Sequence, residues 1–155
     1  MSISDILSLL NSENQLEKNE YGEGFLLNAA EDTEIENLKK IVLAQFGIDV
    51  SSEYLEILKL SNGFSVNGFN LYGSKPYDED FFIDGIVDIN KEFWTEDSLR
   101  QYFTYGDESS TRLVYNMDSN LYEAVDNVTW EKLEIFHDFS DLLNYVFENN
   151  NIFDS

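Results

Sequence analysis

The chain has 155 residues, of which 43% are hydrophobic, so one domain can bury a sizeable core. Its 31 acidic residues stand against only 9 basic ones, and the formal net charge of -22 argues against binding to nucleic acids or anionic membranes, which need positive surface. Aromatic residues make up 15% of the chain, unlike disordered acidic chains, so we expect it to fold.

The N-terminal residues have the apolar spacing of a helix. A short first helix is predicted over residues 3–10, where the apolar side chains share one face and Ser2 and Asp5 have the spacing of a capping box. Residues 11–28 are polar and are predicted to be a loop, with one strand at 25–27.

Two more helices are expected before the first hairpin. The second begins near Thr33 and ends at Gly47, and the third begins after Ser51 and ends at Asn62-Gly63. The second helix carries an apolar stripe that consists of Ile35, Leu38, Val42 and Phe46.

From residue 64 onward the apolar residues follow the period of two that is typical of strands. Asn67-Gly68 separates two such runs and is the strongest short hairpin signal available. Residues 77–80 are predicted to be an acidic loop, and residues 86–94 a strand end followed by a helical turn. Further strands are predicted at 81–83, 99–105, 111–117, 121–125 and 133–136, with a loop at 106–110.

A last helix is predicted after Asp138, and the tail from Asn149 to Ser155 is expected to fray. The order of elements gives an α+β fold: one antiparallel meandering sheet with N-terminal helices and a C-terminal helix packed on one side. No linker divides the sequence, so residues 1–155 are predicted to form a single domain. The predicted core residues are Leu58, Phe69, Leu71, Val114, Leu142 and Val146.

The sequence also bears on the cellular compartment. The chain has no cysteine, hence no disulfide frame, which favours a reducing compartment. The N-terminus lacks a basic start and Asp5 interrupts its short apolar run, so no signal peptide is expected. Because no apolar run approaches the length of a membrane helix, we expect a cytoplasmic protein.

Residues that could support catalysis are scarce. His137 is the only histidine, so a zinc site or a catalytic pair built on histidine has at most one member here, and we expect a surface or capping role for it. The sequence from Asp80 onward does not match a calcium-binding loop, because Phe82 and Lys91 occupy positions that need ligands. Carboxylate pairs are neither supported nor excluded by their number. We expect no enzyme activity, no metal and no cofactor, and a carboxylate-dependent hydrolase is the less favoured alternative.

Acidic residues are concentrated between positions 76 and 110, where ten of them stand against Lys91 and Arg100. A solvated face that keeps the protein soluble is one explanation, and a surface that steers a basic partner is the other. Trp94 and Trp130 could anchor such a partner, although core or half-buried packing is the favoured interpretation for each.

Residues 50–63 read Val-Ser-Ser-Glu-Tyr-Leu-Glu-Ile-Leu-Lys-Leu-Ser-Asn-Gly and resemble the signature segment of the SUKH superfamily. That segment is a short helix with a Tyr and spaced aliphatic residues, ended by Asn-Gly and followed by a strand pair, here at 64–72. Residues 105–110 are similar to the family's strand end and acidic loop of small residues.

The rest of the family pattern follows in order, with a hairpin at 113–125, Trp130 and a closing helix at 139–147. The resemblance covers residues 31–148 and leaves the first thirty uncovered. Two departures bear on the subfamily. Asp49-Val50 stands where Leu-Pro is common, and Ser110-Thr111 stands in place of a glycine common in the acidic loop.

The resemblance implies a non-enzymatic intracellular binding protein. Bacterial members of the superfamily are mostly immunity proteins that neutralise a cognate protein toxin, often a nuclease, and fungal relatives act as scaffolds in cell-wall regulation. An acidic inhibitor suits a nuclease, which must carry a basic substrate groove. We therefore expect a basic toxin as partner and a monomer or weak homodimer, with a regulatory scaffold that has no toxin partner as the alternative.

Loops at one end of the predicted sheet are the expected place for the interface, because they can vary without unfolding the core. Tyr77 or Tyr105 is expected to be the anchor, and the acids are expected to pair with Lys or Arg. Asp118, at a hairpin tip, is expected to lie beside them. The candidate partner-binding residues are Tyr77, Asp78, Asp80, Tyr105, Asp107, Glu108 and Asp118.

Overall fold

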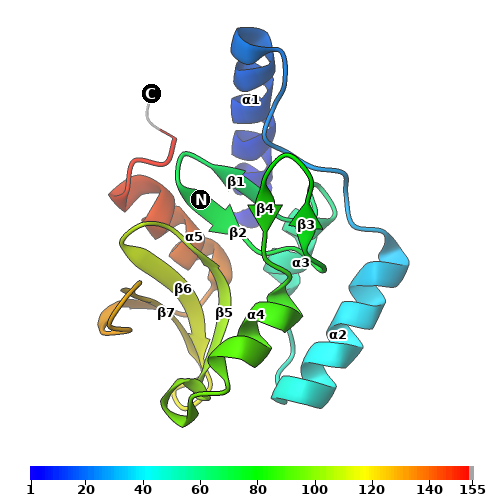
Figure 1. Cartoon of the computed structure of the whole chain (residues 1–155). Helices are drawn as coiled ribbons and strands as arrows, with labels where there is room; N and C mark the ends of the chain where they lie inside the picture. The colour runs from blue at the N-terminus through cyan, green and yellow to red at the C-terminus, as the bar shows by residue number, and fades with distance from the viewer. Residues whose placement is uncertain (154–155) are drawn as a thin grey trace.

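Helices and antiparallel strands form the α+β fold in Figure 1, a computed structural model that describes residues 1–153. The helices are α1 Ile3–Tyr21, α2 Asp32–Phe46, α3 Ser52–Leu58, α4 Ile86–Phe93 and α5 Phe139–Asn149, with a 3-10 turn η1 at Asp97–Leu99. The strands are β1 Phe64–Val66, β2 Phe69–Leu71, β3 Tyr77–Asp78, β4 Phe82–Ile83, β5 Tyr102–Asp107, β6 Thr111–Asn116, β7 Leu121–Asp126 and β8 Lys132–Phe136. The predicted fold class is confirmed.

The main sheet is an antiparallel meander with one insertion. Its six strands lie in the order β1-β2-β5-β6-β7-β8, so strands adjacent in space are adjacent in the chain except where β2 meets β5. The chain between them forms the separate β3–β4 hairpin and α4. α1, α2, α3 and α5 share one hydrophobic core with one face of the sheet.

Aromatic rings fill the centre of this core. Tyr54 of α3, Tyr105 of β5 and Phe139 of α5 are buried, with ring centroids 4.9 to 6.0 Å apart. The two phenol groups are hydrogen-bonded, as buried hydroxyls must be: Tyr54 donates to the Tyr72 carbonyl at 2.6 Å, and Tyr105 accepts from the Ser51 amide at 3.0 Å. These bonds fix α3 against the sheet.

The six predicted core residues are all fully buried. Five of them belong to the main core, whereas Val114 lies outside it. Its neighbour Leu113 points into the main core, and successive strand residues point to opposite faces, so Val114 lies on the other side of the sheet.

The hairpin signal at Asn67-Gly68 is confirmed. Both residues have positive φ, 49° and 83°, as a two-residue turn of type I′ requires. β1 and β2 pair across this turn from Val66↔Phe69 to Phe64↔Leu71, and these four apolar side chains are buried.

The first helix is much longer than predicted. α1 continues through residues 11–21, which were assigned to a loop, and its end projects beyond the sheet (Figure 1). This segment contains three Glu and one each of Gln, Leu and Lys, residues that favour a helix even without an apolar face. Asn14 in this extension accepts a hydrogen bond from the Leu26 amide at 2.9 Å and so holds the following segment, where Leu26 makes an isolated bridge to Phe64.

Residues 86–93, predicted as a strand end and a helical turn, form the helix α4, which lies along the edge of β5. The Thr104 amide donates to Asn90 Oδ1 at 2.8 Å, and Asn90 Nδ2 donates to the Thr104 carbonyl at 2.9 Å. Asn90 thus occupies the hydrogen-bonding position of a neighbouring strand. Trp94 contacts Phe46 on the core side, and Phe93 contacts Trp130 on the other.

Gly106 and Asp107, predicted to be loop, are part of β5 and pair with β2. A Cβ at position 106 would stand 2.4 Å from the carbonyl oxygen of Asn70, so the close approach of these strands requires glycine. A register shift between Thr104 and Gly106 accompanies this junction.

The tail does not fray as predicted, at least as far as residue 153. Ile152 is buried, and its carbonyl accepts a hydrogen bond from Asn67 Nδ2 at 2.7 Å. The Phe153 ring lies 5.0 Å from Phe147 and 5.9 Å from Phe25. Apolar contact with the core therefore holds this segment, and the remaining tail residues lie outside the described part of the chain.

Candidate binding surface

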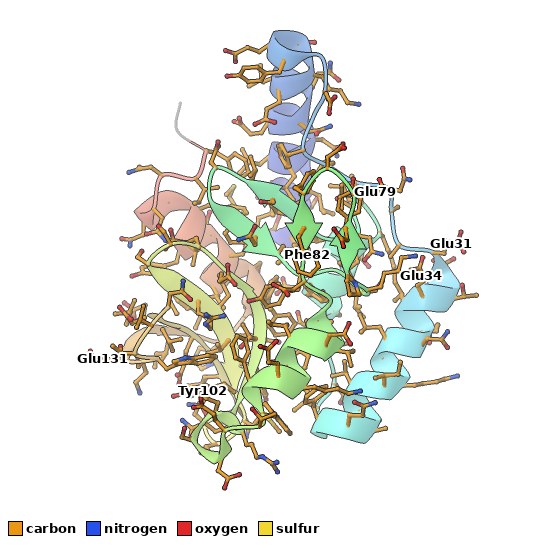
Figure 2. All side chains as sticks on the ribbon, in the orientation of Figure 1. Glu31, Glu34, Glu79, Phe82, Tyr102 and Glu131 are labelled. Atoms are coloured by element: carbon orange, nitrogen blue, oxygen red, sulfur yellow. The ribbon has the colours of Figure 1, made fainter. Side chains whose placement is uncertain are left out.

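The β3–β4 hairpin brings exposed acidic and aromatic side chains together. Tyr77 contacts Phe81 with ring centroids 5.0 Å apart, and its hydroxyl donates to Glu79 Oε2 at 3.2 Å. Phe82, labelled in Figure 2, is 55% exposed and its neighbour Phe81 is 41% exposed, so the hairpin presents two adjacent aromatic side chains to solvent. We define the hairpin acids as the three exposed carboxylates Asp78, Glu79 and Asp80.

Acidic charge continues from the hairpin along α4. Asp88 and Glu92 are exposed and one helical turn apart, so they share one face of the helix. Burial raises the pKa of the nearby Asp84, and the charges of Asp107 and Glu92 raise it further. The positive charge of Arg112 opposes this shift. The carboxylates of Asp84, Asp88 and Glu92 are therefore close enough for their charges to interact, and this acidic surface runs from the end of β4 along α4.

Arg112 of β6 stands at the inner edge of this surface. Its guanidinium carbon lies 4.7 Å from the ring centroids of both Phe93 and Trp130, within cation–π range. It also donates to the Tyr72 hydroxyl at 3.2 Å and lies 3.6 Å from an Asp107 carboxylate oxygen. The side chain therefore links α4 and the loop after β7 to the sheet.

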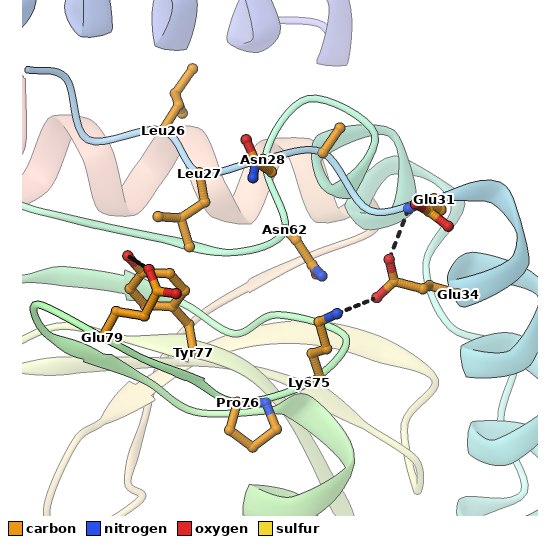
Figure 3. A pocket seen from close by; sticks show the side chains of 11 residues that line it. Leu26, Leu27, Asn28, Glu31, Glu34, Asn62, Lys75, Pro76, Tyr77 and Glu79 are labelled. Atoms are coloured by element: carbon orange, nitrogen blue, oxygen red, sulfur yellow. Dashed lines mark hydrogen bonds and ion pairs between the residues drawn. The ribbon is translucent and has the colours of Figure 1, made fainter.

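A pocket of about 540 Å³ opens on the other side of the hairpin. One wall is the segment 26–31 between α1 and α2, and the other is the segment 75–79 that leads into β3 (Figure 3). Both walls are held by backbone hydrogen bonds to the rest of the molecule. The Leu27 amide donates to Ser61 Oγ at 2.8 Å, and the amide before Lys75, that of Ser74, donates to Asn62 Oδ1 at 2.8 Å.

The pocket lining combines apolar side chains with acidic ones. Three carboxylates, from Glu31, Glu34 and Glu79, stand against the single ammonium of Lys75. The hydrogen bond from the Glu31 amide lowers the pKa of Glu34, burial acts in the opposite direction, and Lys75 at 3.3 Å lowers it further. Because Lys75 is already paired with Glu34, the charge of Glu79 is not compensated within the lining.

Of the residues predicted to bind a partner, Tyr77, Asp78 and Asp80 lie together on the hairpin. The two acids are exposed, and Tyr77 is half-buried with its ring against Phe81. These three residues remain candidates for a partner surface.

The prediction that Tyr105 is an interface anchor is wrong. The side chain is 1% exposed and lies among core aromatic rings, with its hydroxyl bonded to the Ser51 amide. Strand alternation explains the error: Tyr105 follows Phe103 by two residues, so both point into the main core.

The two acids of the β5–β6 turn were predicted to pair with a partner, but their carboxylates are engaged inside the molecule. Asp107 accepts hydrogen bonds from the Tyr72 hydroxyl and from Asn70 Nδ2. Glu108 is 6% exposed and accepts from the Ser110 amide at 2.8 Å and from its hydroxyl. They shape the turn and are not available for docking in this state.

Asp118 is exposed, but it does not lie beside the other candidate loops. β5 and β6 pair from Asp107↔Arg112 at one end to Tyr102↔Asn116 at the other. Asp118 follows β6, so it stands at the end of the sheet opposite to Asp107. The predicted grouping of Asp118 with Asp107 and Glu108 is therefore wrong.

The exposed aromatic side chain at position 82 was not recognised in the sequence, because residues 81–83 fitted a strand. The available signal was the run Phe81-Phe82-Ile83 between Asp80 and Asp84: neighbours in a strand point to opposite sides, so the three apolar side chains could not all be buried, and only Ile83 is. Trp94 and Trp130 are half-buried and bound within the molecule, in line with the favoured interpretation of each.

His137 is exposed, and the residue at the cap of α5 is Asp138. Within residues 1–153, no three His, Asp or Glu side chains are arranged to hold a metal ion. Over the same part of the chain, no helix combines the length and the apolar character needed to cross a membrane.

A scan against models of protein families and a search of curated proteins both found no match to this chain.

Proposed function

We propose that this chain is a non-enzymatic binding protein of the SUKH type, an immunity protein that neutralises a cognate basic toxin through the hairpin and the acids of α4. The observation that carries the proposal is the exposure of Phe82 next to the hairpin acids. An apolar side chain surrounded by charge has the composition of an interface centre with its rim.

Charge complementarity supports a basic partner. The formal net charge of -22 creates a negative field that accelerates encounter with a positively charged protein and repels nucleic acids. The carboxylates of Asp84, Asp88 and Glu92 continue the negative surface from the hairpin along α4. A nuclease toxin carries a basic groove for its substrate, so this surface could cover that groove.

The surroundings of two partly buried acids, Asp84 and Asp107, support a binding role over hydrolysis. Asp84 and Asp107 are the neighbouring carboxylates whose charges interact, which is the feature an acid-base pair would need. Asp107, however, accepts from Tyr72 and lies beside the Arg112 guanidinium, so its oxygens are used to hold the sheet together.

Co-expression with the product of the adjacent gene tests the proposal directly. The expected result is that the toxin gene alone stops growth, that this chain restores it, and that the two proteins co-purify in a one-to-one complex. Affinity capture from the native cell followed by mass spectrometry is the companion experiment. A partner that is a cellular enzyme or receptor, with no toxic activity, would contradict the immunity function and favour the regulatory scaffold.

A further inference from the structure

We propose that the pocket between residues 26–31 and 75–79 receives an arginine side chain of the partner. This inference rests on the proposed function for the identity of the partner, but the pocket's preference for an arginine is a separate property. The pocket shares Tyr77 and Glu79 with the hairpin, whereas its other wall, residues 26–31, lies outside the hairpin.

One wall of the pocket, residues 26–31, is held in place before any ligand binds. The Leu26 amide is held by Asn14, the Leu27 amide by Ser61, and the Ala30 amide by the Leu58 carbonyl at 2.8 Å. Ligands lose less free energy to ordering when walls of this kind are already in place.

The lining matches an arginine in both its parts. Leu27 and Tyr77 face each other from opposite walls in Figure 3, and Pro76 precedes Tyr77 on the second wall, so an aliphatic stem meets apolar surface. A guanidinium can then stack on the Tyr77 ring and bind the Glu79 carboxylate in a planar, two-point contact. The Tyr77 hydroxyl already donates a hydrogen bond to the Glu79 carboxylate and so orients it.

Charge selects a cation over a neutral or acidic group. The lining holds three carboxylates, Glu31, Glu34 and Glu79, against Lys75 alone. Lys75 is bound to Glu34, and its ammonium points toward Glu34 and away from Glu79 (Figure 3). The volume of about 540 Å³ exceeds one side chain and leaves room for the peptide backbone that carries it.

The probe for this site is N-acetyl-argininamide, titrated into ¹⁵N-labelled protein and followed by NMR. We expect amide shifts confined to residues 26–31 and 75–79, with a Kd of about 1 mM, as weak as the small size of the probe demands. N-acetyl-citrullinamide has the same shape without the charge and should bind at least about tenfold more weakly, because it cannot pair with a carboxylate.

Two adjacent single-charge variants separate the pocket from general attraction. Glu79→Gln keeps an acceptor for Tyr77 and removes the charge in the pocket, whereas Asp80→Asn removes the same charge from the exposed tip outside the lining. Glu79→Gln should weaken probe binding about tenfold, and Asp80→Asn less than twofold. The spectra themselves show whether each variant is folded.

Equal weakening by the two variants, equal binding of citrulline, or shifts spread over the surface would each overturn the arginine pocket. Equal or tighter binding of N-acetyl-lysinamide would overturn its preference for a guanidinium. If the toxin binds Glu79→Gln with unchanged kinetics while the probe does not, the proposed function stands and the toxin does not use the pocket. If the probe binds as expected and no toxin exists, the pocket stands and the immunity function falls.

Discussion

Two groups of acidic residues that look alike in the sequence have opposite surroundings in the structure. Asp78 and Asp80 of the β3–β4 hairpin are exposed, whereas Asp107 and Glu108 of the β5–β6 turn are bound inside the molecule. Each pair lies at the end of a strand, and both lie in the acidic stretch between residues 76 and 110. The difference lies in their neighbours, because hydroxyl, amide and guanidinium donors surround the turn, and such donors convert a carboxylate from a docking group into a structural one.

Removing Arg112 should have the largest effect, because it takes away the cation that balances Asp107. Arg112→Ala also leaves the rings of Phe93 and Trp130 without their contact. We expect a loss of about 3 kcal/mol in the free energy of unfolding, measured by urea denaturation. Arg100→Ala, which removes an exposed arginine, is the control and should change stability by less than about 0.5 kcal/mol. Equal losses would show that Arg112 is not structural.

Glu108→Ala should cost about 1 to 3 kcal/mol, because the Ser110 amide and hydroxyl lose their acceptor. Burial acts to raise the pKa of Glu108, but the hydrogen bonds from Ser110 and Ser109 outweigh it and hold the pKa below its ordinary value of 4.5. The stabilisation is therefore present above about pH 4.5 and is lost as the pH falls through the lower folded pKa.

Urea denaturation of wild type and variant across the acid range checks this dependence. The difference in stability between the two should shrink as the pH decreases below 4.5. A difference that stays constant down to pH 2 would show that the carboxylate charge of Glu108 contributes nothing.

Charge reversal should separate the two groups in function. Asp78→Lys with Asp80→Lys should change stability by less than about 0.5 kcal/mol, since both side chains are exposed. The same variant should slow association with a basic partner by about tenfold at low salt, as measured by stopped-flow or surface plasmon resonance. Reversal of Asp107 and Glu108 should instead destabilise the fold. Unchanged association by the hairpin variant would remove the hairpin acids from the interface.

Asp84→Asn should have the smallest effect on stability, and it should stabilise the fold where the preceding variants destabilise it. Burial and the charges of Asp107 and Glu92 raise the pKa of Asp84, so the folded chain holds this proton more tightly than the unfolded chain does. Its negative charge therefore disfavours folding at neutral pH, and the variant should raise the melting midpoint by a few degrees at most. The gain should disappear as the pH falls through the folded pKa of Asp84, which calorimetry at several pH values would show.

The helices and strands that bury a periodic apolar face could be predicted from the sequence. α2, α3, α5 and the β1–β2 hairpin are of this kind, because their apolar spacing and terminal residues agree. The second half of α1 has no such face, so its pattern resembles that of a polar loop. The residues of α4 also gave a mixed pattern, since the helix lies at a sheet edge and contacts both faces.

The candidate site was less predictable than the fold, because exposure depends on contacts between segments far apart in the chain. Tyr105 could have been placed in the core by its spacing from Phe103, yet its polar tip suggested a surface position. The role of Glu108 depends on two serines beside it and could have been inferred locally. The pocket could not, since its walls are about 45 residues apart in sequence.

The side-chain amide of Asn90 also prevents another polypeptide from adding a strand at this edge of the sheet. β2 covers β5 only at Gly106 and Asp107, so the backbone groups of Thr104 would otherwise form an open strand edge. Such an edge is a template for a strand from another polypeptide, and therefore for aggregation or domain swapping. Asn90 satisfies the Thr104 amide and carbonyl from a helix, which cannot be extended by a further strand. α4 thus shields the sheet from strand addition at the point where the insertion leaves it, while the acids on its other side stay free for a partner.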